Sequence, residues 1–342
     1  MKSILIGLIL GTILGGAVFW YIRQANVVQV GISKYSNAVI EEVTFYALKC
    51  NDACERIARH GILYRNSKAK ATVVVCHGFM CDKSDIRCLR HMFKDYNVFF
   101  FDFRAHGEDT HGQLCTFGCD EVHDIHAAVD YIRSHKDLKG KPVIVYSFSM
   151  GSVSSIHAQA RYGNLFDCAI WDCPFDSTDR LITRLLGDMQ FSLFGYSFAV
   201  PGQAFLRKHV YNPQLQMFIK AMLRAIKHSE DTPIPIQMVP VDTVEFAKNI
   251  KIPSFFITCV NDKKAPPSAV QRVYDAAQGY KRYWITAGRR HFDSYFYNPE
   301  KYEYRVHKFI DEFLDNTYKK KQAEKVYRDI PVTEEEAEVK SI

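Results

Sequence analysis

The chain has 342 residues, of which 47% are hydrophobic and 24% charged, and its net charge is +6 at pH 7. This composition is that of an ordinary globular protein and excludes a disordered or fibrous chain. Basic residues are scattered, apart from the run Lys319, Lys320 and Lys321, so the sequence predicts no nucleic-acid-binding surface.

The first notable segment is an N-terminal apolar run. Residues 3–22, "SILIGLILGTILGGAVFWYI", carry no charge and end in Trp20 and Tyr21. A helix of about 20 apolar residues spans a hydrocarbon core of roughly 30 Å, and Trp and Tyr favour the membrane interface. We therefore predict that residues 1–23 form a single membrane anchor, with a cleaved signal peptide as the alternative. The short basic N-terminal tail favours an extracytoplasmic location for the rest of the chain.

The chain contains ten cysteines. Cys50 and Cys54, and likewise Cys115 and Cys119, lie close together in polar stretches, as disulfide-bonded cysteines outside the cytosol often do. An intracellular chain with unpaired thiols explains the same count. The C-x3-C spacing lacks an accompanying pair of histidines, so no metal site is predicted.

Beyond the N-terminal segment, short apolar runs alternate with stretches of helical periodicity. Strands are expected at 43–48 and 59–65, as an antiparallel pair, and then at 71–79, 97–103, 142–148, 167–173, 253–260 and 282–288. Helices are expected at 85–93, 120–135, 150–162, 268–278 and 299–315. This alternation predicts an α/β fold with a mostly parallel sheet and helices on both faces. Ligand-binding residues are then expected at the carboxyl ends of the strands.

One region interrupts the alternation. Residues 175–251 contain no strand-like run, so we predict a helical cap inserted in a domain that spans 41–315. The cap is rich in aromatic residues, and Phe191, Phe194 and Phe198 are candidates to line an apolar substrate pocket. The alternative is that these rings form the core of the insertion itself. The charged segment 316–342 is predicted to be a mobile tail.

The stretch "YSFSMGS", residues 146–152, predicts a sharp strand-to-helix turn with Ser149 at its apex. The usual pattern for a nucleophilic serine in such a turn is G-x-S-x-G. Here Gly151 provides the second small residue and Ser147 replaces the first glycine. Serine is one of the smallest substitutes, so Ser149 is predicted to be a nucleophile. A helix-capping serine is the alternative.

An acid and a base follow later strands. Asp262 comes directly after the run 253–260, and His291 lies in the loop after 282–288. The chain order Ser149, Asp262, His291 is the order nucleophile, acid, base. Asp172, at the end of another strand, is the alternative acid.

The first parallel strand is followed by "CHGF". Gly78 allows a tight turn there, so that the backbone N–H of Phe79 and that of Met150 are predicted to form an oxyanion hole. His77 is predicted to brace this loop rather than to act as a base.

The motifs "VVVCHGF", "FFFDFRAHGED", "VIVYSFSMGS", "ITCVNDKKAPP" and "GRRHFDSY" together resemble the α/β-hydrolase-fold serine hydrolases. The resemblance covers about 41–315 and is to the group of monoacylglycerol-lipase-like and acyl-thioesterase-like enzymes with an N-terminal membrane anchor. It implies that Ser149, Asp262 and His291 are the catalytic triad, and that the segment from Asp102 to Gly107 is a structural turn. The sequence departs from the family pattern at Ser147 and in "TCVND", which replaces "HGxxD".

The predicted function is hydrolysis of carboxylic esters or thioesters, with acyl or lipid-like small-molecule substrates and an acyl-enzyme intermediate. No metal or organic cofactor is expected, and the membrane is the expected partner of the N-terminal segment. A serine peptidase on the same fold is one alternative. The other is an inactive, membrane-tethered binding protein.

Overall fold

The structure is a computed structural model, and it describes residues 38–50, 55–110, 112–188, 190–193, 196–199, 203–217 and 234–319. The predicted anchor 1–23 and residues 320–342 of the predicted tail lie outside these ranges. Among the described residues, no helix is long and apolar enough to cross a membrane.

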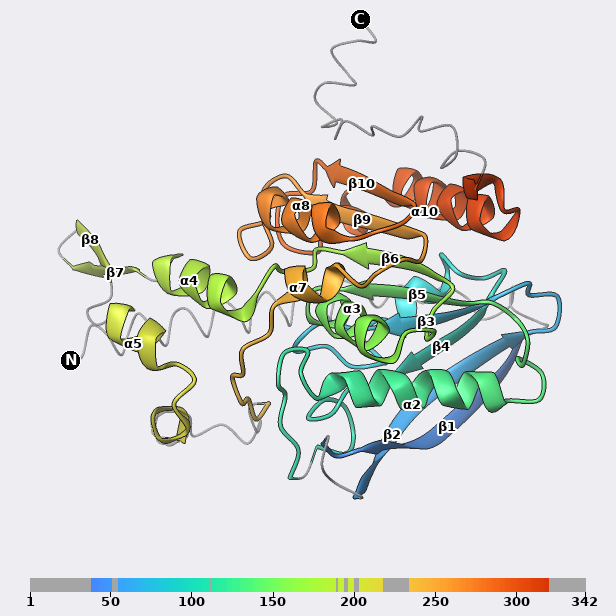
Figure 1. Cartoon of the computed structure of the whole chain (residues 1–342), viewed down its shortest axis with the longest axis horizontal. Helices are drawn as coiled ribbons and strands as arrows, with labels where there is room; N and C mark the ends of the chain where they lie inside the picture. The colour runs from blue at the N-terminus through green and yellow to red at the C-terminus, as the bar shows by residue number, and fades with distance from the viewer. Residues whose placement is uncertain are drawn as a thin grey trace, which may run out of the picture.

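A sheet of eight strands forms the centre of the molecule, in the order β1-β2-β4-β3-β5-β6-β9-β10 (Figure 1). The antiparallel strands are β1 (Ala38–Leu48) and β2 (Arg56–Asn66), and β2 also pairs antiparallel with β4 (Asn97–Phe101). β4 pairs in parallel with β3 (Thr72–Cys76), and the parallel part of the sheet continues through β5 (Val143–Phe148), β6 (Cys168–Asp172), β9 (Ser254–Cys259) and β10 (Lys281–Thr286). The prediction of a mostly parallel sheet preceded by an antiparallel pair is confirmed.

The central strands are buried along their whole length because both faces of the sheet are covered. Every residue of β3, β4, β5, β6 and β9 is buried. These strands are rich in Val, Ile and Phe, which pack well on a pleated surface. A sheet with one solvated face would show polar residues at alternate positions instead.

Helices cover both faces of the sheet, as predicted. The helices α2 (Glu121–Ser134), α3 (Met150–Tyr162), α7 (Thr243–Ala247) and α8 (Pro267–Ala276) lie on the face toward the viewer in Figure 1. The helix α10 (Pro299–Leu314) covers the other face. Two neighbouring residues of β5 show this: Ser147 contacts Ser155 of α3, whereas Tyr146 contacts Tyr302 of α10. Successive strand residues point to opposite faces, so the two helices lie on opposite sides.

The predicted helix at 85–93 is wrong in type and length. This segment contains a four-residue 3-10 helix, η2 (Arg87–Arg90), between turns. Its backbone bonds repeat with a spacing of three residues, as in Leu89 N–H to Ile86 O at 3.0 Å. The carboxylate of Asp82 accepts from the backbone N–H groups of Ser84 and Asp85. Such local side-chain bonds compete with an α-helical start.

The insertion is not purely helical. After α4 (Thr178–Asp188), the strands β7 (Gln190–Leu193) and β8 (Tyr196–Ala199) form an antiparallel hairpin, and α5 (Gln203–His209) follows. In Figure 1 these elements lie to the left of the sheet, beyond the carboxyl ends of its parallel strands. Phe191 and Phe198 are cross-strand partners in the hairpin, and Phe194 lies outside the described residues. That these rings line a pocket stays a prediction.

Of the two possibilities left open for Cys115 and Cys119, the structure shows unpaired thiols, because both residues are free. The Cys115 side chain points into the core, where its Sγ lies 3.4 Å from the sulfur of Met150. The Cys50–Cys54 pair is not tested, since Cys54 lies outside the described residues.

Candidate active site

Three side chains from distant parts of the chain meet at the carboxyl ends of β5, β9 and β10. Ser149 Oγ lies 2.7 Å from His291 Nε2, and His291 Nδ1 lies 2.7 Å from Asp262 Oδ2. A carboxylate only accepts hydrogen bonds, so Nδ1–H donates to Asp262 and Nε2 accepts from the hydroxyl of Ser149. Ser149, His291 and Asp262 therefore form one continuous chain of hydrogen bonds.

Ser149 occupies a strained turn between β5 and α3. Its φ of 53° and ψ of −123° are unusual for a residue with a side chain. Its backbone N–H donates to Asp172 O at 3.0 Å, which fixes the turn. A Cβ at Gly151 would lie 2.2 Å from Cys76 O and 2.5 Å from His77 O, so only glycine fits there. The geometry is that of a nucleophile elbow.

Ser147 stands where the usual pattern has its first glycine, and its side chain fits there without displacing the turn. Ser147 is fully buried, and its Oγ lies 3.0 Å from Ser155 Oγ and 3.3 Å from Ser152 Oγ. Trp171 Nε1–H donates to Ser155 Oγ at 2.9 Å. The facing turn of α3 thus offers small, polar side chains, which leave room for the Cβ of Ser147 and a partner for its hydroxyl.

The acid loop holds Asp262 in a single orientation. Its Oδ1 accepts from the backbone N–H groups of Lys264 and Ala265, both at 2.9 Å, and its side chain is fully buried. Only Oδ2 is left to receive His291. The departure of "TCVND" from the family pattern therefore does not turn the carboxylate away from the imidazole.

The alternative acid, Asp172, lies beneath the turn and bonds to a different partner. Its Oδ2 accepts from Tyr302 Oη at 2.8 Å, and Tyr302 Oη lies 3.0 Å from Tyr146 Oη. Burial, with a smaller effect from the nearby charge of Asp262, raises the pKa of Asp172 to about 7. The carboxylate that contacts His291 is that of Asp262.

The loop after β3 is braced by His77. This buried imidazole donates from Nδ1 to Gly78 O at 2.8 Å and accepts at Nε2 from the backbone N–H of Phe103 at 3.0 Å. Burial lowers its pKa to about 3, so His77 is neutral. A Cβ at Gly78 would lie 2.9 Å from the ring of Phe148, so the loop needs glycine to approach the elbow.

The predicted oxyanion-hole donors lie on the two segments that meet there. Met150 is the first residue of α3, so its N–H has no acceptor within the helix. Phe79 follows Gly78 in the loop that approaches the elbow. Their role in binding an oxyanion stays a prediction.

The segment from Asp102 to Gly107 is a structural turn tied down by ion pairs. Asp102 accepts from both the backbone N–H and the Nζ of Lys83, each at 2.7 Å. The guanidinium of Arg104 pairs with the buried carboxylate of Asp124 at 3.0 Å. A Cβ at Gly107 would lie 2.1 Å from Asp102 Oδ2, so this position also requires glycine.

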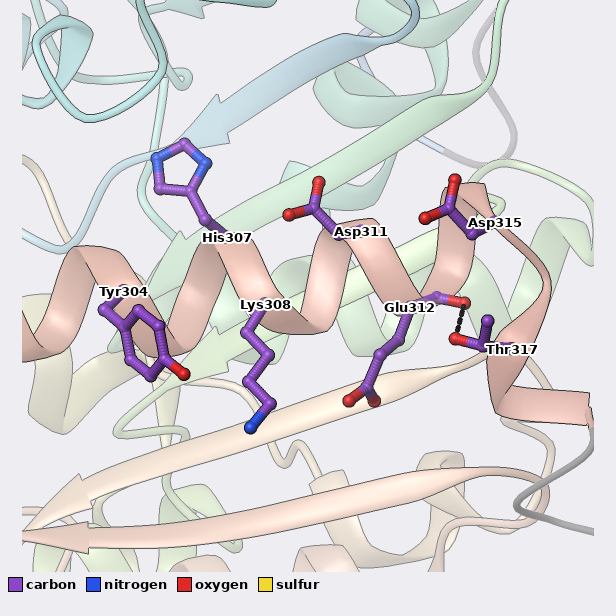
Figure 2. Close-up of a pocket in the computed structure, with 7 residues that line it drawn as sticks. All are labelled: Tyr304, His307, Lys308, Asp311, Glu312, Asp315 and Thr317. Carbon is purple, nitrogen blue, oxygen red and sulfur yellow. Dashed lines mark hydrogen bonds between the residues drawn. The ribbon is translucent and has the colours of Figure 1, made fainter.

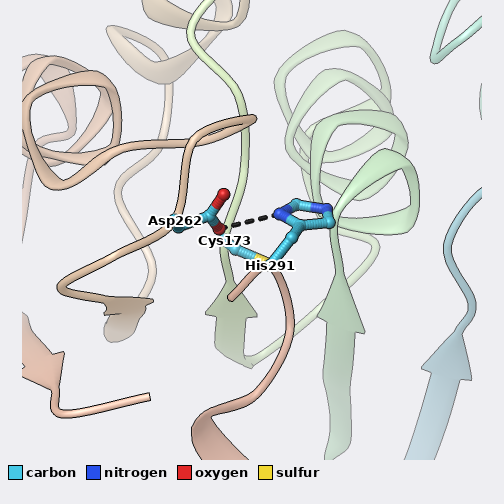
Figure 3. A group of neighbouring side chains, drawn as sticks. All are labelled: Cys173, Asp262 and His291. Carbon is cyan, nitrogen blue, oxygen red and sulfur yellow. Dashed lines mark hydrogen bonds and ion pairs between the residues drawn. The ribbon is translucent and has the colours of Figure 1, made fainter. Parts of the chain in front are cut away.

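Sequence reasoning missed two neighbours of the triad. The Sγ of Cys173 and the ligand atoms of Asp262 and His291 all lie within 4.8 Å of one another (Figure 3). A thiolate, an imidazole and a carboxylate are ligands that Zn²⁺ accepts. Burial, however, raises the pKa of the Cys173 thiol well above its usual value. Phe292, whose φ is 57°, directly follows His291, and its ring stacks on that of Phe148 with the ring centroids 3.7 Å apart. Both residues directly follow or adjoin a residue already singled out, and that position was the available signal.

A hollow of about 350 Å³ lies along α10 (Figure 2). It is lined by Tyr304, His307, Lys308, Asp311, Glu312, Asp315 and Thr317. None of these residues takes part in the hydrogen bonds that join Ser149, His291 and Asp262. The candidate site is therefore defined by the triad geometry and not by this hollow.

A mostly parallel eight-stranded sheet with a serine elbow after β5 defines the α/β-hydrolase fold. A family model described as serine aminopeptidase, S33, matches residues 67–292, and the chain belongs to that hydrolase family.

One sequence relative covers most of the chain, and two solved structures share this fold. An uncharacterized protein of Bacillus subtilis, YqkD, is 26% identical over 250 residues, which cover 72% of this chain and 73% of that protein. The esterase Pf2001 of Pyrococcus furiosus superposes with a TM-score of 0.61 at 20% identity, covering 84% of this chain and 97% of the esterase. The acetyl xylan esterase of Paenibacillus sp. R4 has a TM-score of 0.53 at 15% identity, covering 82% and 86% of the two chains.

Proposed function

We propose that the protein is a serine hydrolase that cleaves carboxylic ester or thioester bonds of acyl substrates. The observation that carries the proposal is the hydrogen-bonded chain from Ser149 through His291 to Asp262, with both contacts at 2.7 Å. A serine hydroxyl becomes a good nucleophile when a positioned base accepts its proton. Membership of a hydrolase family is independent support.

The proposed reaction begins with the hydroxyl of Ser149. His291 Nε2 takes the proton while Oγ bonds to the acyl carbonyl carbon, and the carbonyl π electrons move to oxygen. The N–H groups of Phe79 and Met150 stabilise this oxyanion, each by about 3 kcal/mol. The intermediate then collapses, the bond to the leaving oxygen or sulfur breaks, and His291 gives its proton to the leaving group. Water, deprotonated by His291, releases the acid and restores Ser149.

Asp262 serves this reaction by holding the imidazole. Its Oδ2 keeps the proton of His291 on Nδ1, so that Nε2 is the basic atom that faces Ser149. The carboxylate also stabilises the imidazolium that forms in each half of the reaction.

The second candidate function is peptide hydrolysis, which the description of the family favours. An aminopeptidase binds a protonated amino terminus, for which carboxylates are the suitable partners. The exposed charged side chains next to Asp262 and His291 are instead Lys263, Lys264, Arg289 and Arg290. This charge supports ester or thioester hydrolysis over aminopeptidase activity.

The experiment for the proposed function is active-site labelling. The protein and its Ser149→Ala variant are treated with a fluorophosphonate, and the adduct is mapped by mass spectrometry. The proposal predicts an adduct on Ser149 and turnover of p-nitrophenyl butyrate, both lost in the variant. Hydrolysis of an aminoacyl p-nitroanilide without ester turnover would favour the peptidase. A folded protein that neither reacts nor turns over any of these substrates would support the binding-protein alternative.

The proposal includes a membrane location through residues 1–23, with the hydrolase domain on the extracytoplasmic side. Its support is the uncharged run of 20 residues at 3–22. The test is fractionation of cells that express the full chain, followed by carbonate extraction and protease treatment of intact cells. Release of the protein by carbonate would contradict the anchor, and protection from protease would contradict the orientation.

A further inference from the structure

Two pairs of basic residues flank the acid and the base of the triad. Lys263 and Lys264 directly follow Asp262, and Arg289 and Arg290 directly precede His291. All four side chains are exposed. The 2.7 Å bond between Asp262 and His291 joins the two loops, so the loops that carry the four cations are adjacent at the site.

The carboxylates of these loops do not cancel this charge at the surface. Asp262 and Asp293 are buried, with side-chain exposures of 0% and 4%. Arg289 pairs with Asp293 at 3.5 Å. In the part of the chain that the structure describes, no ion pair involves Lys263, Lys264 or Arg290. Their charges are therefore available to a ligand.

A third group of cations adjoins the acid loop. The buried carboxylate of Asp176 pairs with Arg180 at 3.3 Å, with Arg184 at 2.8 Å and with Arg272 at 2.5 Å. One negative charge thus faces three positive ones, which leaves an excess of positive charge. Arg180 is the most exposed of the three, at 54%. The nearby exposed acid, Asp179, accepts a hydrogen bond from Tyr211 Oη at 2.8 Å.

The Asp176 group is fixed against the acid loop by a further bond. Arg184 Nε–H donates to the backbone oxygen of Lys264 at 3.0 Å. Burial alone would raise the pKa of Asp176, but the hydrogen bonds from Arg184 and Arg272 outweigh it and lower this pKa. Asp176 therefore stays ionised and holds the guanidinium groups in place. We call Arg180, Lys263, Lys264 and Arg290 the basic edge of the site.

We propose that the basic edge binds a phosphate-class anionic group on the substrate, so that the preferred acyl ester or thioester has a phosphate-bearing leaving group. This inference rests on the proposed function. Several positively charged side chains around one site attract an anionic ligand and orient it. Arginine and lysine are the side chains that bind phosphate in proteins. A lipid headgroup and a nucleotide carrier offer the same chemistry, and the experiment separates them.

The test uses two substrate pairs that differ only in the phosphate-bearing part. The first pair is 1-butyrylglycerol and 1-butyrylglycerol 3-phosphate. The second is S-butyryl-N-acetylcysteamine and butyryl-coenzyme A. For each compound we would measure kcat/KM with the full chain, and the Kd for the Ser149→Ala variant by calorimetry. Binding to this variant reports on the basic edge even if hydrolysis is absent.

We expect the phosphate-bearing member of at least one pair to have a kcat/KM about tenfold higher and a Kd about tenfold lower. Screening predicts that both preferences shrink between about 50 and 500 mM salt. A preference in the glycerol pair identifies a lipid headgroup, and one in the thioester pair identifies a nucleotide carrier. Equal or weaker binding and turnover of the phosphate-bearing member in both pairs overturns the inference.

A double variant, Lys263→Gln with Lys264→Gln, should reduce the preference to near one. The matched control is Lys136→Gln with Lys139→Gln. These two exposed lysines lie in the loop before β5, at the amino ends of the parallel strands and therefore at the end of the sheet opposite to the triad. The control should keep the preference. An unchanged preference in the Lys263 and Lys264 variant would overturn the assignment to the basic edge. Tighter binding of the phosphate-bearing ligands without hydrolysis of any ester would refute the proposed function but retain the anion site.

Discussion

The hydroxyl oxygens of Ser147 and Ser155 lie 3.0 Å apart in the core beside the turn that carries Ser149. The contact joins β5 to the first turns of α3, at the position where the usual elbow pattern has glycine. Because Ser152 and Ser155 are small, α3 crosses the strand closely enough to keep Ser149 in its strained conformation. The small residues of α3 thus leave room for Ser147 at the position where the usual pattern has its first glycine.

This packing predicts the effect of restoring the glycine. Ser147→Gly removes the buried hydroxyl that contacts Ser155 and Ser152 and adds backbone freedom, so the free energy of unfolding should fall by about 1 kcal/mol. Ser149 should still react with a fluorophosphonate at a similar rate. Urea unfolding and the labelling rate are the measurements. As a comparison, Ser147→Val overpacks the site and should lose about 1–3 kcal/mol. Labelling that becomes tenfold faster in Ser147→Gly would show instead that Ser147 hinders the turn.

Much of the fold and of the site geometry was predictable because strand ends converge in a parallel sheet. Ser149, Asp262 and His291 each follow an apolar run by a few residues, and parallel strands bring such positions to one edge. The sheet order and the directions of the side chains were not predictable this way, since they depend on contacts between distant segments. Cys173 is an example: its position directly after Asp172 places it at a strand end, but it does not show that the thiol adjoins Asp262 and His291.

Other features were not predictable because their local signals are weak. The hairpin of β7 and β8 alternates apolar and polar residues, as in Phe191, Ser192 and Leu193, which is the period of a strand. Each strand has only four residues, so its alternation of apolar and polar residues is a weak signal. For Cys115 and Cys119, close spacing does not distinguish a disulfide from free thiols, and the core position of Cys115 directs its sulfur toward Met150.

The second elbow glycine should be indispensable. In Gly151→Ala the new Cβ would lie 2.2 Å from the backbone oxygen of Cys76, so the strand or the helix must move. We expect a loss of about 3 kcal/mol or more in the free energy of unfolding. The control is Gly187→Ala in α4, where nothing lies within 4 Å of the added Cβ. It should be neutral or stabilising by up to about 1 kcal/mol. Thermal unfolding of both variants measures the difference, and equal midpoints would contradict the close crossing.

The two buried aspartates should differ sharply in their effect on turnover. Asp262→Asn loses the carboxylate that holds His291, so kcat should fall about ten-thousand-fold. Asp172→Asn keeps the size of the side chain and the backbone bond to Ser149 N, so its effect should be at least a hundredfold smaller. Turnover of p-nitrophenyl butyrate by both folded variants is the measurement. A larger loss in Asp172→Asn would make Asp172 the catalytic acid.

Asp172 should also make the stability of the protein depend on pH. Burial raises its pKa from 3.8 to about 7 in the folded state, whereas the unfolded chain releases this proton near pH 4. Between these values the folded state binds the proton and the unfolded state does not. The stabilisation from protonated Asp172 is therefore complete below about pH 4 and is lost as the pH rises through 7.

The expected size of this loss is about 3 kcal/mol between pH 5 and pH 8. The Asp172→Asn variant has no proton to release at this position, so it should lack this part of the pH dependence. Its free energy of unfolding should therefore fall less between pH 5 and pH 8 than that of the unchanged protein. The measurement is urea unfolding of both proteins at the two pH values, because the other titrating groups cancel in the difference. Parallel pH profiles would mean that Tyr302, which donates to Asp172 at 2.8 Å, stabilises the carboxylate enough to offset its burial.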